Sequence, residues 1–100
     1  FDMEYAPRKI EIPQNLTKLA SFPVNRANID TNNHVNNGQY IKMAEEFLPM
    51  GFQIKQMRAE YKMQAVLGDT IVPYISSEED KCTILLSNLE GKPYAVIEFT

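Results

Sequence analysis

The chain has 100 residues, 44% of them hydrophobic, which suits a single domain with one small core. Its net charge is -3 at pH 7, and its lysines and arginines are dispersed, without the basic stripe that nucleic-acid-binding domains carry. No apolar run reaches the roughly 20 residues that a membrane-spanning helix needs. We therefore expect neither a nucleic acid nor a membrane among its partners.

Cysteine and histidine content restricts the chemistry further. Cys82 is the single cysteine, so no disulfide can form within the chain, which fits a reducing compartment such as the cytoplasm. One histidine and scattered acids offer no cluster of metal ligands, and we expect neither a metal nor another cofactor. The sequence begins at Phe1 and not at a methionine, which we interpret as a processed product or a part of a longer protein.

The N-terminal part of the chain mixes charged residues with prolines, which predicts an extended lead-in or linker over residues 1–18. The folded domain is expected to span residues 19–100. Its first element, over residues 19–29, is predicted to be an irregular strand. Pro23 places that strand at an edge or a bulge, because proline has no N–H to donate to a sheet.

A helix is predicted next, because apolar residues recur at helical spacing. They are Tyr40, Met43, Ala44 and Phe47. Pro49 and Gly51 are expected to end the helix after three to four turns, a length of about 20 Å at 1.5 Å per residue.

After the helix the apolar spacing changes from helical to alternating, which predicts a half-buried strand. Its apolar residues are Met57, Ala59, Tyr61 and Met63. Gly68 and Asp69 then predict a turn, and residues 70–76 a further strand. Residues 81–89 and 93–100 are expected to form a hairpin. One helix facing an antiparallel meander of strands is an α+β arrangement.

The stretch "DTNNHVNNGQYI", which begins at Asp30, places many polar groups at the start of the predicted helix. In an extended segment, Asp30, Asn32 and His34 project on one side. Asn36 and Asn37 lie where the helix begins, and its first turn presents unpaired N–H groups that can bind an oxyanion. With an acid and an imidazole nearby, these are the parts of an acyl-transfer site. The same residues also suit a purely structural role as caps and turns.

The longer segment "NIDTNNHVNNGQYIKMAEEFLP" resembles the motif at the helix entrance of hotdog-fold thioesterases, and more narrowly that of the acyl-acyl carrier protein thioesterases of plants and bacteria. The positions that match the family pattern are Asp30, Asn32, His34, Val35, Asn36, Asn37, Tyr40 and Ile41. Further along, "EYKMQAVLGDTI" is similar to the family's E-Y-x-x-E-x-x-x-G-D strand and turn. The resemblance covers nearly the whole chain.

This resemblance implies a hotdog fold, in which a curved antiparallel sheet wraps around one central helix. It also implies hydrolysis of fatty acyl-acyl carrier protein thioesters, which releases free fatty acid and terminates fatty acid synthesis. In the family's mechanism, Asn32 and His34 would position and deprotonate a water molecule, and Asp30 would orient them or act as the base. Backbone N–H groups from about Asn36 and Asn37 onward would polarise the thioester carbonyl.

The chain departs from the family pattern at Gln64, where the family has a glutamate, and at Ala65, where plant members have a cysteine. Gln64 can hold hydrogen bonds but cannot take up a proton. Either Asp30 carries all the acid–base work, or activity is reduced. The alternatives left open are a non-catalytic hotdog domain that binds acyl thioesters or their carrier protein, and a thioesterase that acts on acyl-CoA.

Family members carry two hotdog repeats with the polar motif in the second, so the resemblance implies a missing N-terminal repeat. An isolated chain would then expose a strand edge and form a homo-oligomer. Acyl carrier protein is the implied substrate carrier. Some basic residues are candidates to contact this acidic carrier, although an ordinary solvated surface is the simpler interpretation. They are Lys42, Lys55, Arg58 and Lys62.

Overall fold

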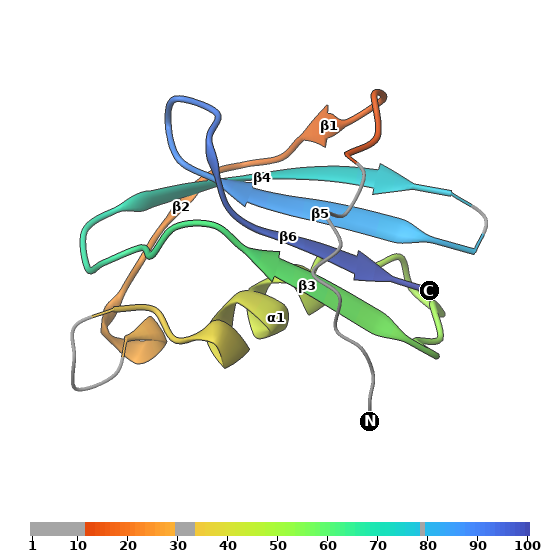
Figure 1. The fold of residues 1–100 in the computed structure, drawn as a ribbon, viewed down its shortest axis with the longest axis horizontal. Helices are drawn as coiled ribbons and strands as arrows, with labels where there is room; N and C mark the ends of the chain where they lie inside the picture. The colour runs from red at the N-terminus through yellow and green to blue at the C-terminus, as the bar shows by residue number, and fades with distance from the viewer. Residues whose placement is uncertain (1–11, 30–33, 79) are drawn as a thin grey trace.

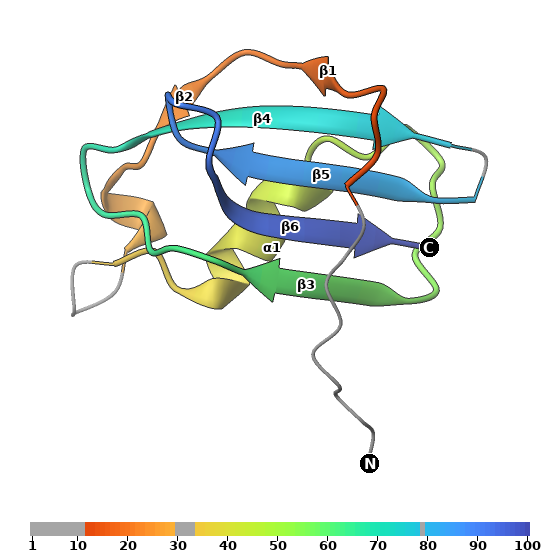
Figure 2. The same ribbon diagram turned by 45° about the horizontal axis from the view of Figure 1, so that its top comes forward.

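A curved antiparallel sheet bends around one α-helix in the computed structural model, which describes residues 12–29, 34–78 and 80–100 (Figure 1). Its elements in chain order are β1 (Thr17–Lys18), β2 (Phe22–Pro23), the 3-10 helix η1 (Arg26–Asn28), α1 (Asn37–Glu45), β3 (Met57–Tyr61), β4 (Thr70–Ser77), β5 (Cys82–Ser87) and β6 (Pro93–Phe99). Figure 2 shows α1 lying against one face of the sheet. This is the predicted hotdog arrangement.

The strand order of the sheet is β1-β4-β5-β6-β3, with β2 also pairing with β4. β4, β5 and β6 form the predicted antiparallel meander. β3, however, pairs with β6 and not with its chain neighbour β4, with Met57 opposite Phe99 and Tyr61 opposite Ala95. The expectation that the strands follow one another as a meander is therefore wrong for β3. A sheet that wraps around a helix needs strands on both flanks, and residues 62–69 carry the chain from one flank to the other.

Both faces of the central strands are buried. Toward α1, the core contains Tyr40, Ile84, Ile97 and Phe99, each 0–1% exposed. Complete burial of such a side chain stabilises a fold by about 1.5–3 kcal/mol. On the opposite face, Leu85 and Val96 form a second cluster together with Leu16 and Tyr74. Burial on both sides explains why β5 and β6 read as continuous apolar runs and do not alternate.

The helix α1 has 9 residues and is therefore about 13 Å long, shorter than the predicted 20 Å. Beyond Glu45, the N–H groups of Phe47 and Leu48 donate to carbonyls three residues back, those of Ala44 and Glu45. This tighter pattern ends the helix. Pro49 is the physical reason, because a proline disfavours helical backbone at the residue before it.

The segment predicted as one irregular strand is divided between two elements. Pro23 lies in β2, opposite Thr70. Among the described residues, β4 is the one strand that pairs with β2. The edge position predicted for this proline is confirmed. The following residues form η1, because the side chains of Asn25 and Asn28 accept backbone N–H groups within the turn and so stabilise it locally.

β3 is less buried than the alternating pattern predicted. Ala59 and Met63 pack against the core, whereas Met57 and Tyr61 are 40% and 39% exposed. Within the described residues β3 has a partner strand on one side only. The exposure of these two residues is a correction to the prediction that all four face the core.

The sheet begins before the predicted start of the domain at residue 19. Thr17 and Lys18 pair with β4 as β1, so the sheet already includes the last residues of the expected lead-in. The boundary at residue 18 stays a prediction.

No helix within the described residues is long and apolar enough to span a membrane.

Candidate active site

The start of α1 is capped by Asn36, whose side-chain oxygen accepts the N–H of Gln39 at 3.1 Å. Asn37 is the first helical residue, and both asparagines are exposed. Among the described residues, the N–H groups of Asn37 and Gly38 have no acceptor. The helix therefore presents two unpaired donors and the positive end of its dipole at an exposed position.

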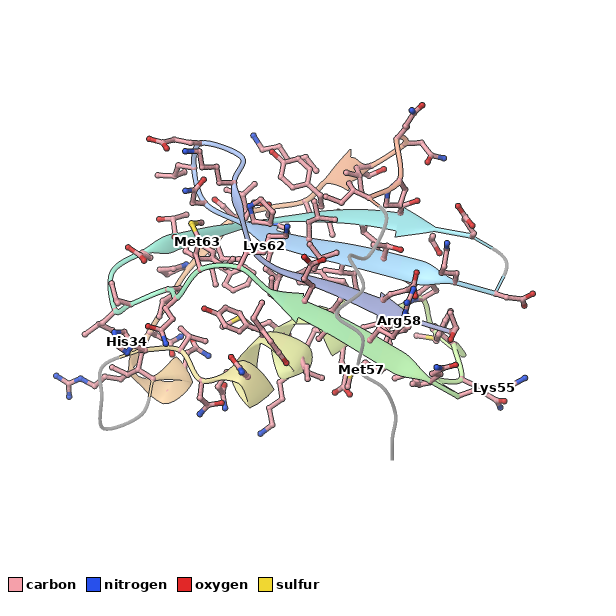
Figure 3. All side chains as sticks on the ribbon, viewed as in Figure 1. His34, Lys55, Met57, Arg58, Lys62 and Met63 are labelled. Atoms are coloured by element: carbon pink, nitrogen blue, oxygen red, sulfur yellow. The ribbon has the colours of Figure 1, made fainter. Side chains whose placement is uncertain are left out.

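A short antiparallel ladder leads into this helix start. His34 lies opposite Val66, and the N–H of Val35 donates to the carbonyl of Ala65 at 2.9 Å. Because Val35 and Ala65 are 2% and 0% exposed, alternation directs His34 to the other, accessible side of the ladder. Figure 3 shows His34 at the end of the molecule where α1 begins.

The hydrogen bond between Val35 and Ala65 brings the segment of a third predicted residue, Gln64, to the site. Asn36 and Gln64 are the chain neighbours of Val35 and Ala65, which this hydrogen bond joins. Asn36 and Gln64 are both exposed. His34, Asn36 and Gln64 therefore flank the buried pair of Val35 and Ala65, next to the unpaired donors of α1.

Two tyrosines connect the segment of Gln64 to the helix through hydrogen bonds. The Tyr40 hydroxyl accepts the N–H of Ala65 at 2.9 Å in the buried interior, and its ring lies 6.0 Å from the ring of Tyr61. The Tyr61 hydroxyl donates to the carbonyl of Asn37 at 3.5 Å. Burial raises the pKa of both phenols, so both stay protonated and uncharged at neutral pH.

Tyr61 was not among the residues predicted for the site. It stands in the "EYKMQ" segment three residues before Gln64, and its role as a contact to the helix start follows from the pairing of β3 with β6, which sequence spacing does not reveal. Tyr40 was predicted as a core residue and as a position of the motif. Both of these roles are consistent with its 1% exposure.

The predicted turn after this segment is confirmed. Asp69 accepts the N–H of Val66 through its side chain at 3.0 Å and donates its own N–H to the Val66 carbonyl. Gly68 has a φ of +95°, a conformation that favours glycine over other residues. The turn therefore holds the chain directly after Val66, the residue that pairs with His34.

Asp30 and Asn32 lie outside the described residues. Ile29 and Val35, which flank this part of the chain, pair with each other in an antiparallel bridge. The convergence of Asp30 and Asn32 with His34 stays a prediction.

The basic residues considered as contacts for a carrier protein are partly engaged elsewhere. Arg58 donates two hydrogen bonds to Glu98, at 2.9 and 2.7 Å, and the Lys62 ammonium lies 3.3 Å from the Glu60 carboxylate. Figure 3 shows Lys55 at the opposite end of the molecule from His34. These residues do not form one free cationic surface beside the candidate site.

A helix wrapped by a curved antiparallel sheet, with polar residues gathered at the start of the helix, defines a domain of the hotdog thioesterase class. The chain belongs to the acyl-ACP thioesterase family, because the family model for the acyl-ACP thioesterase C-terminal domain matches residues 11–99. A comparison with curated proteins gave no match.

Several solved structures share the fold. An acyl-ACP thioesterase from Bacteroides thetaiotaomicron is 18% identical with a TM-score of 0.76, and the match covers 93% of this chain and 42% of that protein. A putative oleoyl thioesterase from Lactobacillus plantarum is 19% identical with a TM-score of 0.74, over 97% of this chain and 42% of that protein. A hypothetical protein from Staphylococcus aureus in complex with CoA is 17% identical with a TM-score of 0.70, over 88% and 75%. The chain thus spans less than half of the first two proteins.

Proposed function

We propose that this chain is the catalytic half of an enzyme that hydrolyses fatty acyl-acyl carrier protein thioesters in the cytoplasm, releasing free fatty acid and ending fatty acid synthesis. The observation that carries the proposal is the ladder at the helix start. In it His34 pairs with Val66, and Asn36 and Gln64 adjoin the hydrogen bond of Val35 to Ala65, beside the unpaired N–H groups of Asn37 and Gly38. Membership of the acyl-ACP thioesterase family supports it.

In the proposed reaction, the thioester carbonyl oxygen accepts the N–H groups at the start of α1, and a water molecule attacks the carbonyl carbon. Asn32 orients this water, and His34 or Asp30 takes its proton. The negative charge that develops on the oxygen is stabilised by the helix donors. When the C–S bond breaks, the proton passes to the thiolate, which leaves as the carrier's thiol. Gln64 holds a hydrogen bond in this network but cannot accept a proton.

Two other functions have specific support. Glutamine at position 64, in place of a titratable side chain, favours a domain that binds acyl thioesters without hydrolysing them. The Staphylococcus aureus structure in complex with CoA favours CoA as the carrier. We prefer hydrolysis of carrier-protein thioesters because the matched family model describes acyl-ACP thioesterases.

We further propose that β3 forms an interface with a second hotdog repeat, or with another copy when the chain is alone. Met57 and Tyr61 are exposed along this strand, which pairs only with β6 among the described residues. An unpaired strand edge with apolar side chains is a ready site for sheet continuation. An N-terminal repeat in the same polypeptide would satisfy the edge. Sedimentation of the isolated chain should then show a dimer or larger assembly, and a monomer at high concentration contradicts this part of the proposal.

Release of thiol from acyl-acyl carrier protein tests the function directly, in the polypeptide that contains this chain and in the chain alone. Replacement of His34 or Asp30 by alanine should lower kcat by about 100-fold or more if these groups move protons. Gln53→Ala, an exposed substitution outside the site, is the matched control. Unchanged turnover in both site variants contradicts the mechanism. Binding of acyl thioester without any thiol release assigns the chain to the non-catalytic class.

A further inference from the structure

A groove of about 480 Å³ lies beside α1, on the side that faces β2 and η1. Its helical wall runs from Gln39 to Glu46, a distance of about 10 Å at 1.5 Å per residue. Gln39 also donates its backbone N–H to the Asn36 cap. The groove therefore begins within the first turn of the helix, where the proposed function places the thioester carbonyl.

The floor of the groove is apolar. Phe22 of β2 and Phe47 at the end of the helix stack with ring centroids 6.3 Å apart, and Met43 lies between them and the helix start. Phe22 and Phe47 pack against the core cluster to which Met43 belongs. The floor is thus fixed by the fold and offers apolar side chains to a ligand.

The rim at the helix-start end consists of side-chain amides. The Asn28 amide donates to the Gln39 side-chain oxygen at 3.4 Å, and the Asn25 oxygen accepts the N–H of Ala27. Among the described residues, the NH₂ groups of Asn25 and Gln39 have no acceptor. The groove therefore offers two uncharged donors above an apolar floor, a combination typical of small-molecule sites.

We propose that this groove binds the pantetheine arm that carries the acyl thioester. The arm is uncharged, with two amide groups separated by aliphatic carbons. Its amide oxygens can accept from Asn25 and Gln39, and its carbons can cover the rings of Phe22 and Phe47. The inference rests on the proposed function, because an acyl thioester at the helix start implies an arm that extends from it.

The charges of the groove favour this ligand over the others that a thioester carries. Lys42 and Glu46 line it with opposite signs, so no net positive charge is available for nucleotide phosphates, which would lie outside. An alkyl tail would bury the side-chain amides of the rim without accepting their hydrogen bonds, which is unfavourable. A ligand with its own amides can accept these bonds. Acyl carrier protein and CoA both have the pantetheine arm, and the experiment separates the two sources.

The test is an NMR titration of the chain with pantetheine, followed by CoA, apo-acyl carrier protein and holo-acyl carrier protein. Pantetheine should shift the side-chain NH₂ signals of Asn25 and Gln39. Ala20→Trp fills the groove from an exposed position and should weaken pantetheine binding by about tenfold or more. Ala27→Trp is the matched control, because Ala27 is also exposed and does not line the groove. Gln39→Met removes one donor at similar side-chain length and should also weaken binding.

Several outcomes overturn the proposal: shifts that map away from these amides, no shift at all, or equal binding by the chain and by Ala20→Trp when both retain the same circular dichroism spectrum. Tighter binding of holo-carrier than of apo-carrier and CoA supports the arm with the carrier protein as its source. Tighter binding of CoA than of both carrier forms supports it with CoA as the source.

Failure of the proposed function has a different signature from failure of the groove. If pantetheine shifts the groove amides but no thioester is hydrolysed, the proposed function fails and the groove assignment stands. If acyl-pantetheine is hydrolysed and Ala20→Trp leaves its KM unchanged, the groove assignment fails and the function stands.

Discussion

The hydroxyl of Tyr40 accepts the backbone N–H of Ala65 at 2.9 Å, and this buried bond joins the first turn of α1 to the segment that carries Gln64. In a regular ladder, the Ala65 N–H would donate to the carbonyl of Val35, whose own N–H already donates to Ala65. Because Tyr40 takes this donor, the ladder ends there. The chain after β3 is thus fixed to the helix start by a side chain.

Replacement of Tyr40 by phenylalanine should lower the free energy of unfolding by about 1–3 kcal/mol, because the buried Ala65 N–H is left without an acceptor. Urea denaturation measures the change. Tyr74→Phe is the control, since the Tyr74 hydroxyl has no hydrogen-bond partner within the described residues, and it should change stability by less than about 0.5 kcal/mol. Equal stability of the two variants would show that the Tyr40 bond contributes nothing.

Replacement of Gln64 by glutamate should raise kcat for thioester hydrolysis by about tenfold or more, because it adds a proton acceptor to the proposed site. Turnover should also gain a dependence on pH near the ordinary carboxyl pKa of about 4.3. Gln53→Glu, the same change at another exposed position, controls for added negative charge. A Gln64→Glu variant with an unchanged rate and pH profile excludes position 64 from proton transfer.

Replacement of Glu98 by glutamine should destabilise the fold, because Glu98 is 7% exposed and accepts two hydrogen bonds from Arg58. We expect a loss of about 1–2 kcal/mol, less than the 3–5 kcal/mol of a fully buried pair, because the Arg58 side chain is 45% exposed. The exposed Glu90→Gln serves as the control. Thermal unfolding of both variants at low and high salt measures the loss. If Glu98→Gln is as stable as Glu90→Gln, the ion pair of Arg58 and Glu98 contributes nothing to the free energy of unfolding.

Stability should fall at alkaline pH. Burial raises the pKa of Tyr40, Tyr61 and Tyr94 above the ordinary 10.0. Above a pH of about 10, the unfolded chain has lost these protons while the folded chain still holds them, so the unfolded state binds fewer protons and the free energy of unfolding decreases. It should be unaffected by these groups below that pH. Urea denaturation across this range measures the decrease, and a constant midpoint contradicts it.

The hotdog arrangement was predicted by resemblance, but several of its elements follow from local sequence alone. The helical spacing of Tyr40, Met43 and Ala44 locates α1, because a periodic apolar face requires only neighbouring turns. Asn36 marks the helix start for the same kind of reason, since its cap bond reaches a residue only three positions away. The turn at Gly68 and the hairpin of β5 and β6 likewise depend on short segments.

Other features depend on residues that are far apart in the chain. Arg58 and Glu98 are 40 positions apart, and their pair exists because β3 lies beside β6. The same pairing leaves Met57 and Tyr61 exposed at the flank of the sheet. No short segment of the sequence indicates which strand β3 pairs with. The pairing is selected when both faces of the sheet become buried together.

For the candidate site, the sequence by itself determined which side chains gather at the start of the helix, through the motif that contains His34 and Asn36. Only the tertiary structure decided that the segment of Gln64 lies beside the helix start, where the Ala65 carbonyl accepts the Val35 N–H and the Tyr40 hydroxyl accepts the Ala65 N–H. The physical reason is that a cap or a turn is stabilised by bonds between neighbours. A register between distant segments is selected by the packing and hydrogen bonding of the whole domain.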